Sequence, residues 1–339
     1  MSKKWNLSYK LGKPFLIAIL LVSSHLVHSQ VCERRDVKLM GCHFDITVVE
    51  SDEARANYFI DLAIAEISRI EKLISSWDPT SETSEINRNS GIRPVKVDLE
   101  LFQLIQRSIA ISQLTDGAFD ISFASMDRIW KFDGSMKSMP SKEEIAASVK
   151  KVGYRNIELN SVDTTVLLRL EGMKIGFGAI GKGYAADKAR RLLESNGVKS
   201  AIINASGDMI TWGTQANGTP WKVAIVNPMN KEKIFGMVDI SDQAIVTSGD
   251  YEKFVIFDGE RYAHIINPKT GMPTKGIISA TVIAQSAELA DALATSVFVM
   301  GIESGLFFIN QLPGVECLLV DEHGKMWKSE GLNLQEKNN

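Results

Sequence analysis

The clearest periodic pattern in the chain lies between residues 53 and 75. Apolar side chains recur there every three or four positions, at Phe59, Ile60, Ala63, Ile64, Ile67, Ile70 and Ile74. This spacing places them on one face of a helix, so we predict a long amphipathic helix over this segment.

The rest of the apolar pattern predicts a mixture of helices and short strands. Pro140-Ser141 gives one of the helices an N-terminal signal. Further helices are expected over residues 98–114, 142–149, 183–195 and 289–300. Strands are expected over residues 44–49, 174–177, 201–204, 222–226, 235–240, 254–257, 262–266 and 279–284. We therefore predict an α+β fold, a single mixed domain with antiparallel sheets and packed helices.

The first 29 residues have the pattern of an export signal. Lysines precede an unbroken apolar run from Phe15 to Val22, and Val27-His28-Ser29 places compact residues at the usual cleavage spacing. The run is shorter than the stretch of about 20 residues that spans a bilayer. We predict a signal peptide over residues 1–29 and a mature domain over residues 30–339, with an uncleaved membrane anchor as the alternative.

Composition narrows the class of protein further. Charged residues make up 23% of the chain and the net charge is −3, whereas a nucleic-acid-binding surface would require a basic excess. Three cysteines do not make a disulfide framework. Cys317 lies in an apolar run and is expected to be a buried thiol, and a Cys32–Cys42 bridge stays open.

A glycine-rich turn separates a predicted strand from a predicted helix. Gly176-Phe177-Gly178-Ala179-Ile180-Gly181-Lys182-Gly183 matches both G-x-G-x-x-G and G-x-x-x-x-G-K, patterns that bring backbone N–H groups to phosphate oxygens. A P-loop needs Ser or Thr where this chain has Gly183, and a dinucleotide fold places its turn early in a parallel unit. The pattern therefore indicates a phosphate-bearing ligand, with a purely structural turn as the alternative.

Asp291 and Thr295 are four residues apart in a predicted helix of small apolar residues, so they share one face. A buried acid is costly unless it is paired or binds a metal, and oxygen ligands suit Mg²⁺. The alternative is a helix acid that interacts with the dipole, with Thr295 bonding back to a carbonyl.

Two polar clusters follow in the C-terminal half, Thr247-Ser248-Gly249-Asp250-Tyr251 and His264-Ile265-Ile266-Asn267-Pro268. A hairpin closed by Asp258-Gly259 is expected to bring them to one end of a sheet. His264 then becomes a candidate general base, because its ordinary pKa lies near neutrality. A lone histidine on a strand is more often structural. Asp208, after another strand, adds a second acid.

Seven segments in register, within residues 39–326, resemble the ApbE family, the FAD:protein FMN transferases. They are Met40-Gly41, Ser75-Ser76-Trp77-Asp78-Pro79 with Ser84-Glu85-Ile86-Asn87, Thr115-Asp116-Gly117-Ala118-Phe119-Asp120, Gly181-Lys182-Gly183-Tyr184-Ala185-Ala186-Asp187, the two polar clusters, and Asp291-Ala292-Leu293-Ala294-Thr295. The chain departs from the family pattern at four places. Cys42 stands where threonine is usual, Ile121-Ser122 where Pro-Thr is usual, and Gly181 where alanine is common. Ser206 stands where a second glycine usually precedes Gly207-Asp208.

The resemblance implies a role for each matching position. Asp291 and Thr295 would bind Mg²⁺ through their side chains and Gly181 through its carbonyl. His264 would be the base for the acceptor hydroxyl, and Lys182 would assist at the phosphates. The FAD site would be lined by Met40, Trp77, Ala118, Phe119, Asp120, Lys182, Asp187 and Ile265.

The resemblance also implies the reaction. A Thr or Ser hydroxyl of a partner would attack the FMN-side phosphorus of FAD, with Mg²⁺ neutralising the phosphates, and AMP would leave. The implied partners are exported flavin-carrying subunits of membrane redox complexes. With the export signal, the expected location is the periplasm, with association with the inner membrane as the alternative. An FAD pyrophosphatase that gives FMN and AMP shares all these residues. A non-catalytic flavin-binding protein would be expected to lack Asp291, Thr295 or Lys182.

Overall fold

The computed structural model describes residues 30–250 and 254–336. The predicted signal peptide, residues 1–29, lies outside this part of the chain, as does Tyr251. Within it, no helix is both long enough and apolar enough to cross a membrane.

An eight-stranded sheet forms the centre of the molecule, and all its neighbouring strands pair antiparallel. In spatial order its strands are β1 (Val31–Leu39), β2 (Cys42–Glu50), β6 (Ser200–Ala205), β7 (Asp208–Trp212), β10 (Ala244–Gly249), β13 (Ile277–Ala284), β14 (Glu316–Asp321) and β15 (Met326–Lys328). Every residue of β13 is buried, because both faces of the sheet are covered.

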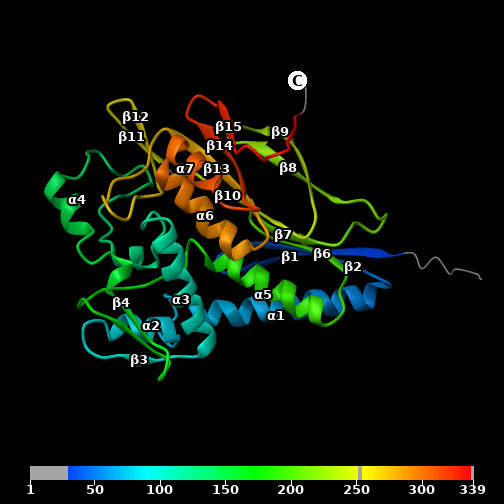
Figure 1. Ribbon diagram of the computed structural model, residues 1–339, viewed down its shortest axis with the longest axis horizontal. Coiled ribbons are helices and arrows are strands. Elements are labelled where there is room, and N and C mark those ends of the chain that lie inside the picture. Colours follow the sequence, from blue (N-terminus) through cyan, green and yellow to red (C-terminus); the bar gives the residue numbers. More distant parts are fainter. Residues whose placement is uncertain (1–29, 251–253, 337–339) are drawn as a thin grey trace, which may run out of the picture.

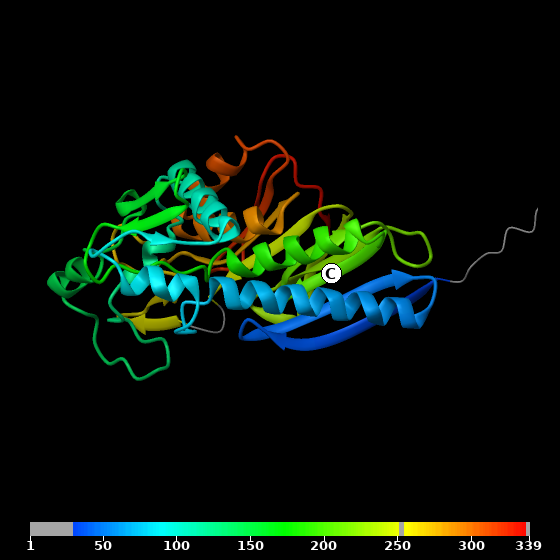
Figure 2. The ribbon, with the colours of Figure 1, turned by 90° about the horizontal axis from the view of Figure 1, so that it is seen from below.

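Helices cover one face of this sheet and a second sheet covers the other (Figure 1). The helices are α1 (Glu53–Ile74), α5 (Gly181–Ser195) and α6 (Ala287–Met300), and Figure 2 shows α1 and α5 side by side. The second sheet consists of β8 (Trp221–Asn227), β9 (Asn230–Ile240) and β16 (Gln335–Glu336). Alternation along β2 serves both layers, because Ile46 and Val48 join the helix-side core while Val49 packs against β8 and β9.

Smaller elements extend the molecule around the helix ends. They comprise the sheet of β3 (Val95–Lys96), β5 (Thr165–Leu168) and β4 (Ile157–Asn160), helices α2 (Glu82–Arg88), α3 (Leu99–Leu114), α4 (Lys142–Ser148) and α7 (Ile302–Ile309), the 3₁₀ turns η1 (Ile121–Ser125) and η2 (Tyr154–Asn156), and the hairpin β11 (Phe254–Phe257)–β12 (Glu260–Ala263).

Tight two-residue turns join three of the hairpins. Met40-Gly41, Ser206-Gly207 and Asp258-Gly259 each have positive φ at both positions, and each lies between paired residues. Such turns match the twist of antiparallel strands and favour Asn, Asp or Gly. Ser206 tolerates the conformation while its hydroxyl bonds to the backbone of His43 on β2.

The α+β prediction is confirmed, and all the predicted helices are present with shifted ends. α5 begins at Gly181, two residues before the predicted start. Two predictions about strands were wrong. The first strand is β1, which precedes the predicted one. Its exposed and partly buried side chains alternate, but four consecutive charged residues, Glu33 to Asp36, hide this period, and charged residues are usual on an edge strand.

Residues 174–177 are also not a strand. The backbone N–H and C=O of Ile175 bond instead to the side-chain amide of Asn87, and the N–H of Lys174 bonds to the hydroxyl of Ser125. Side chains from α2 and η1 therefore replace a neighbouring strand, a long-range arrangement that the apolar pattern does not reveal.

The cysteines are all free. In the β1–β2 hairpin, Cys32 lies opposite Val49 and Cys42 lies opposite Leu39, at the two ends of the hairpin. A Cys32–Cys42 bridge is therefore excluded in this fold. Cys317 is fully buried in β14, as predicted.

Candidate active site

A cavity of about 1040 Å³ opens where the N-terminus of α5 meets α6, the end of β10 and the segment after β12. Sequence segments far apart converge on it, from Ser76 to Val299. The predicted site residues that line it are Trp77, Ala118, Phe119, Asp120, Lys182, His264, Ile265, Asp291 and Thr295. The fold therefore gathers most of the predicted site in one place.

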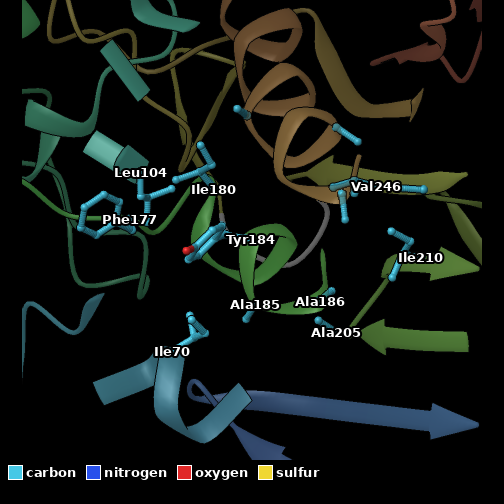
Figure 3. Packing of buried hydrophobic residues seen from close by; sticks show 14 of the residues in the cluster. Ile70, Leu104, Phe177, Ile180, Tyr184, Ala185, Ala186, Ala205, Ile210 and Val246 are labelled. Atoms are coloured by element: carbon cyan, nitrogen blue, oxygen red, sulfur yellow. The ribbon is translucent and has the colours of Figure 1, made fainter. Parts of the chain in front are cut away.

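The glycine-rich turn enters α5 against α6. The N–H of Gly181 bonds to the carbonyl of Phe177 at 2.7 Å, which closes the turn into the helix. A Cβ built on Gly183 would lie 2.5 Å from the carbonyl carbon of Ala287 and closer still to its oxygen. Glycine is thus required by the approach of α6, at the position where a P-loop would carry a hydroxyl. Figure 3 shows Ile180, Tyr184, Ala185 and Ala186 filling the core around this helix start.

Asp291 and Thr295 face the cavity from α6. Asp291 is 4% exposed, and its Oδ2 accepts a hydrogen bond from the N–H of Gly183 at 3.1 Å. The hydroxyl of Thr295 lies 3.4 Å from that of Ser248, at the end of β10. The predicted common face is confirmed, and the end of β10 supplies a further hydroxyl beside it.

One ammonium group in this wall is influenced by two buried carboxylates, of which one is its ion-pair partner. Lys182 forms an ion pair with Asp208, which begins β7 after the Ser206-Gly207 turn. Burial alone would lower the pKa of Lys182, but Asp208 and Asp291 outweigh burial and raise it, so the side chain keeps its proton. Burial first, and then the charge of Asp208, raise the pKa of Asp291 to about 7. The site is therefore short of positive charge at Asp291.

This shortage is what a bound divalent cation would relieve, so the residues present fit Mg²⁺. The donors near Asp291 are carboxylate and hydroxyl oxygens, which Mg²⁺ prefers. Among the described residues no group of three or more His, Cys, Asp or Glu side chains gathers in a form that could hold a metal. A cation here would complete its shell with water or substrate oxygens, which is usual for Mg²⁺.

His264 lies on the cavity wall just after β12. Its neighbours are tied to the loop that follows: the N–H of Ala263 bonds to the carbonyl of Thr274, and the N–H of Thr274 bonds to that of Ile265, each at 2.9 Å. The ring of Phe132 packs edge-on against the ring of His264, with 6.4 Å between the ring centroids. The Asp258-Gly259 turn is present, but β11 and β12 form a separate two-stranded sheet. Residues of both polar clusters thus line the same cavity, but the clusters do not lie at one end of a single sheet.

Most of the residues predicted to bind the flavin nucleotide are spread around the cavity wall. The carboxylate of Asp120 accepts hydrogen bonds from the N–H and hydroxyl of Ser122 and from the N–H of Tyr154, while burial raises the pKa of the carboxyl. Trp77 is 76% exposed, and the guanidinium of Arg128 lies 5.1 Å from its ring centroid. Sequence reasoning missed Arg128, because an arginine in a mixed polar loop carries no local signal.

Three predicted residues do not line the cavity. Met40 and Gly181 lie close to each other, and a Cβ on Gly181 would be 3.6 Å from Met40 Cε. Asp187 is buried one helical turn further along α5, where its carboxylate accepts hydrogen bonds from Ser286, Ala287 and Glu288. Both of its carboxylate oxygens therefore accept hydrogen bonds from the start of α6.

Comparisons with known proteins agree with this geometry. A family model described as the ApbE family matches residues 40–319. A FAD:protein FMN transferase of Klebsiella pneumoniae (strain 342) is 29% identical over 300 residues, which cover 87% of this chain and 85% of the relative. The ApbE protein structure from Thermotoga maritima has a TM-score of 0.81 and 32% identity, covering 91% of this chain and 100% of that one. The apo flavinyl transferase ApbE from Pseudomonas stutzeri has a TM-score of 0.79 at 24% identity, covering 89% and 95%, which shows likeness of fold alone.

Proposed function

The chain belongs to the ApbE family, and on that premise we propose that it is a Mg²⁺-dependent flavin transferase that moves FMN from FAD onto a Thr or Ser hydroxyl of another protein. Curated relatives bear the name FAD:protein FMN transferase, so flavin transfer is the activity to which the family points. The observation that carries the finer proposal is that Asp291, Thr295 and Lys182 all line the same cavity.

The charges of this wall suit the bond that breaks. The pyrophosphate of FAD is an anion, and it is attacked readily only where its charge is neutralised. Bound Mg²⁺ would neutralise phosphate oxygens as a Lewis acid. Lys182 adds a permanent positive charge beside it, because the neighbouring carboxylates raise its pKa.

The acceptor hydroxyl needs a base that takes its proton as its oxygen attacks the phosphorus. His264, on the cavity wall, would take the proton as the hydroxyl oxygen bonds to the FMN-side phosphorus. The bond from that phosphorus to the bridging oxygen breaks, and AMP leaves with that oxygen. The product is FMN joined to the acceptor by a phosphoester, so atoms and charge balance.

The proposed acceptors come from the family resemblance, and the proposed location comes from the predicted export signal. We propose exported flavin-carrying subunits of membrane redox complexes as partners and the periplasm as the compartment. The open cavity supports a protein acceptor, since Trp77 and Phe123 on its wall are exposed.

The test is intact mass spectrometry of an acceptor. The mature chain from Gln30 is incubated with FAD and an exported flavin-carrier domain, with and without Mg²⁺. We expect the acceptor to gain the mass of one FMN phosphoester only with Mg²⁺. Asp291→Ala should abolish that gain, while Asp45→Ala, which removes a carboxylate of β2 paired with Arg34 and outside the cavity lining, should retain it.

Each other outcome contradicts a part of the proposal. Release of AMP and free FMN, with every carrier tested left at its original mass, would indicate the pyrophosphatase reaction. Unchanged transfer by Asp291→Ala would remove the metal assignment. No cleavage of FAD by the wild-type chain would leave only a binding protein.

A further inference from the structure

Helices α5 and α6 hold each other through two carboxylates, one on each helix. Gly183 and Asp187 are four residues apart on α5, and Ala287 and Asp291 are four residues apart on α6, so each pair shares a face. Asp187 accepts hydrogen bonds at the start of α6, and Asp291 accepts one at the start of α5. We call this arrangement the reciprocal clamp, formed by Asp187, Asp291 and the N–H groups that they accept from.

Asp187 satisfies the first two backbone N–H groups of α6 and also accepts from the hydroxyl of its N-cap, Ser286. Its Oδ1 accepts from the N–H of Ala287 at 3.0 Å, and its Oδ2 accepts from the N–H of Glu288 at 2.9 Å and from the hydroxyl of Ser286 at 2.7 Å. Ser286 is itself the N-cap and accepts from the N–H of Leu289 at 3.2 Å. A helix start has such unsatisfied N–H groups and a positive dipole end, so a buried carboxylate there holds it firmly.

A second contact fixes the same turn from another side. The carboxylate of Glu288 is 9% exposed and forms two hydrogen bonds with Arg107 of α3, at 2.6 and 3.1 Å. Gly183 allows the backbone of Ala287 to approach α5. The first turn of α6 is thus anchored on α5 and α3, and Asp291 follows one turn later.

We propose that Asp187 is a positioning residue, which places Asp291 and Thr295 by holding the first turn of α6 and makes no contact with the flavin nucleotide. This inference rests on the proposed function, because it concerns the same site. It differs from the role that the family resemblance implies, in which Asp187 lines the FAD site. Asp187 is 5% exposed, is absent from the cavity wall, and has both carboxylate oxygens bonded to α6.

The two roles predict opposite patterns of binding. If Asp187 contacted FAD, its loss would weaken FAD binding even without metal. If Asp187 positions α6, its loss would leave metal-free FAD binding unchanged and would weaken the binding of a cation at Asp291. Partners that orient a metal ligand typically contribute about 10- to 100-fold in metal affinity.

The experiment uses the mature chain with Asp187→Ala and Asp187→Asn. FAD affinity is measured by flavin fluorescence without metal, and Mn²⁺ affinity is measured by electron paramagnetic resonance of the free ion with FAD present. We expect Mn²⁺ affinity to fall about 10-fold or more in Asp187→Ala and less in Asp187→Asn, whose amide oxygen still accepts one hydrogen bond. Metal-free FAD affinity should not change in either variant.

Asp52→Ala is the matched control, because Asp52 caps α1 through the N–H of Arg55. It should lose some stability with its Mn²⁺ affinity intact. If Asp187→Ala does not fold, Ser286→Ala replaces it, since it removes a hydrogen bond to Asp187 and the cap at Leu289.

The outcomes separate this inference from the proposed function. Unchanged Mn²⁺ affinity in the Asp187 variants, or a loss of metal-free FAD affinity, would overturn the positioning role. Failure of the wild-type chain to bind Mn²⁺ would overturn the metal site itself, and with it any reason to position Asp291.

Discussion

Replacing Gly183 by alanine tests whether the close approach of α5 and α6 builds the site. The new Cβ would lie 2.5 Å from the carbonyl carbon of Ala287 and 2.9 Å from the nitrogen of Glu288, both backbone atoms. Ordinary contact begins at 3.4 Å, so the carbonyl carbon alone requires the two helices to separate by about 0.9 Å, and the still closer carbonyl oxygen of Ala287 requires more. Side-chain rotation cannot relieve a clash with backbone, so α6 itself has to move.

The magnitude follows from two opposing terms. Forcing extra atoms into a packed contact costs about 1–3 kcal/mol, and a backbone clash belongs at the upper end. Alanine is favoured over glycine inside a helix by about 1 kcal/mol. The net loss is therefore about 2 kcal/mol, which corresponds to roughly 3 °C in Tm for a domain of roughly 300 residues. Because Asp291 moves with α6, a shift of about 1 Å is expected to lower the transfer rate about 100-fold.

The assay pairs thermal unfolding with FMN transfer at several Mg²⁺ concentrations. Gly178→Ala is the matched control for stability, because it makes the same change in the same turn and its Cβ would meet no atom within 4 Å. Stability equal to the wild type in Gly183→Ala, with an unchanged Mg²⁺ requirement, would refute the reasoning. A Tm raised by the helical preference of alanine would refute it more strongly.

Two further predictions concern the base and the pH dependence of folding. His264→Ala should reduce the transfer rate by about 10²- to 10⁴-fold while FAD still binds, and an unaltered rate would exclude His264 as the base. Burial opposes the ionisation of Glu100, but hydrogen bonds from Arg69, Lys188 and Tyr184 outweigh it and lower its pKa to about 2. A carboxyl whose pKa is lowered by folding adds stability above its unfolded pKa of about 4.3, and this stability is lost as the pH falls. Urea unfolding should therefore show a wild-type advantage over Glu100→Gln that is full above about pH 5 and disappears toward pH 2; a constant difference would contradict the assignment.

The departures from the family pattern have structural explanations at two positions. Ser206 replaces a usual glycine with φ of 52°, and its hydroxyl bonds to the backbone N–H and carbonyl of His43. Ser122, which follows Asp120 and Ile121, donates to the Asp120 carboxylate and accepts from the N–H of Gly153. The Ser206 hydroxyl thus supplies hydrogen bonds that glycine could not, whereas Ser122 keeps a hydroxyl that threonine would also provide.

Local patterns in the sequence determined the helices, the α+β class and the shared face of Asp291 and Thr295. These features depend on contacts within a few residues along the chain, so spacing alone reveals them. The Asp258-Gly259 turn belongs to the same group, since Asp and Gly both favour the positive φ that such a turn requires.

Tertiary structure decided the features that depend on contacts between residues far apart in the chain. The segment around Ile175 reads as a strand, yet its hydrogen bonds go to Asn87, 88 residues away. The pairing of Lys182 with Asp208 and the placing of Asp187 on α6 depend on how strands and helices pack. The sequence therefore identified the chemical groups of the site. The antiparallel sheet and the α5–α6 contact decided which of these side chains face the cavity and which instead stabilise the helices around it. The reason is that neighbours remote in the chain set the burial and the hydrogen-bond partners of each side chain.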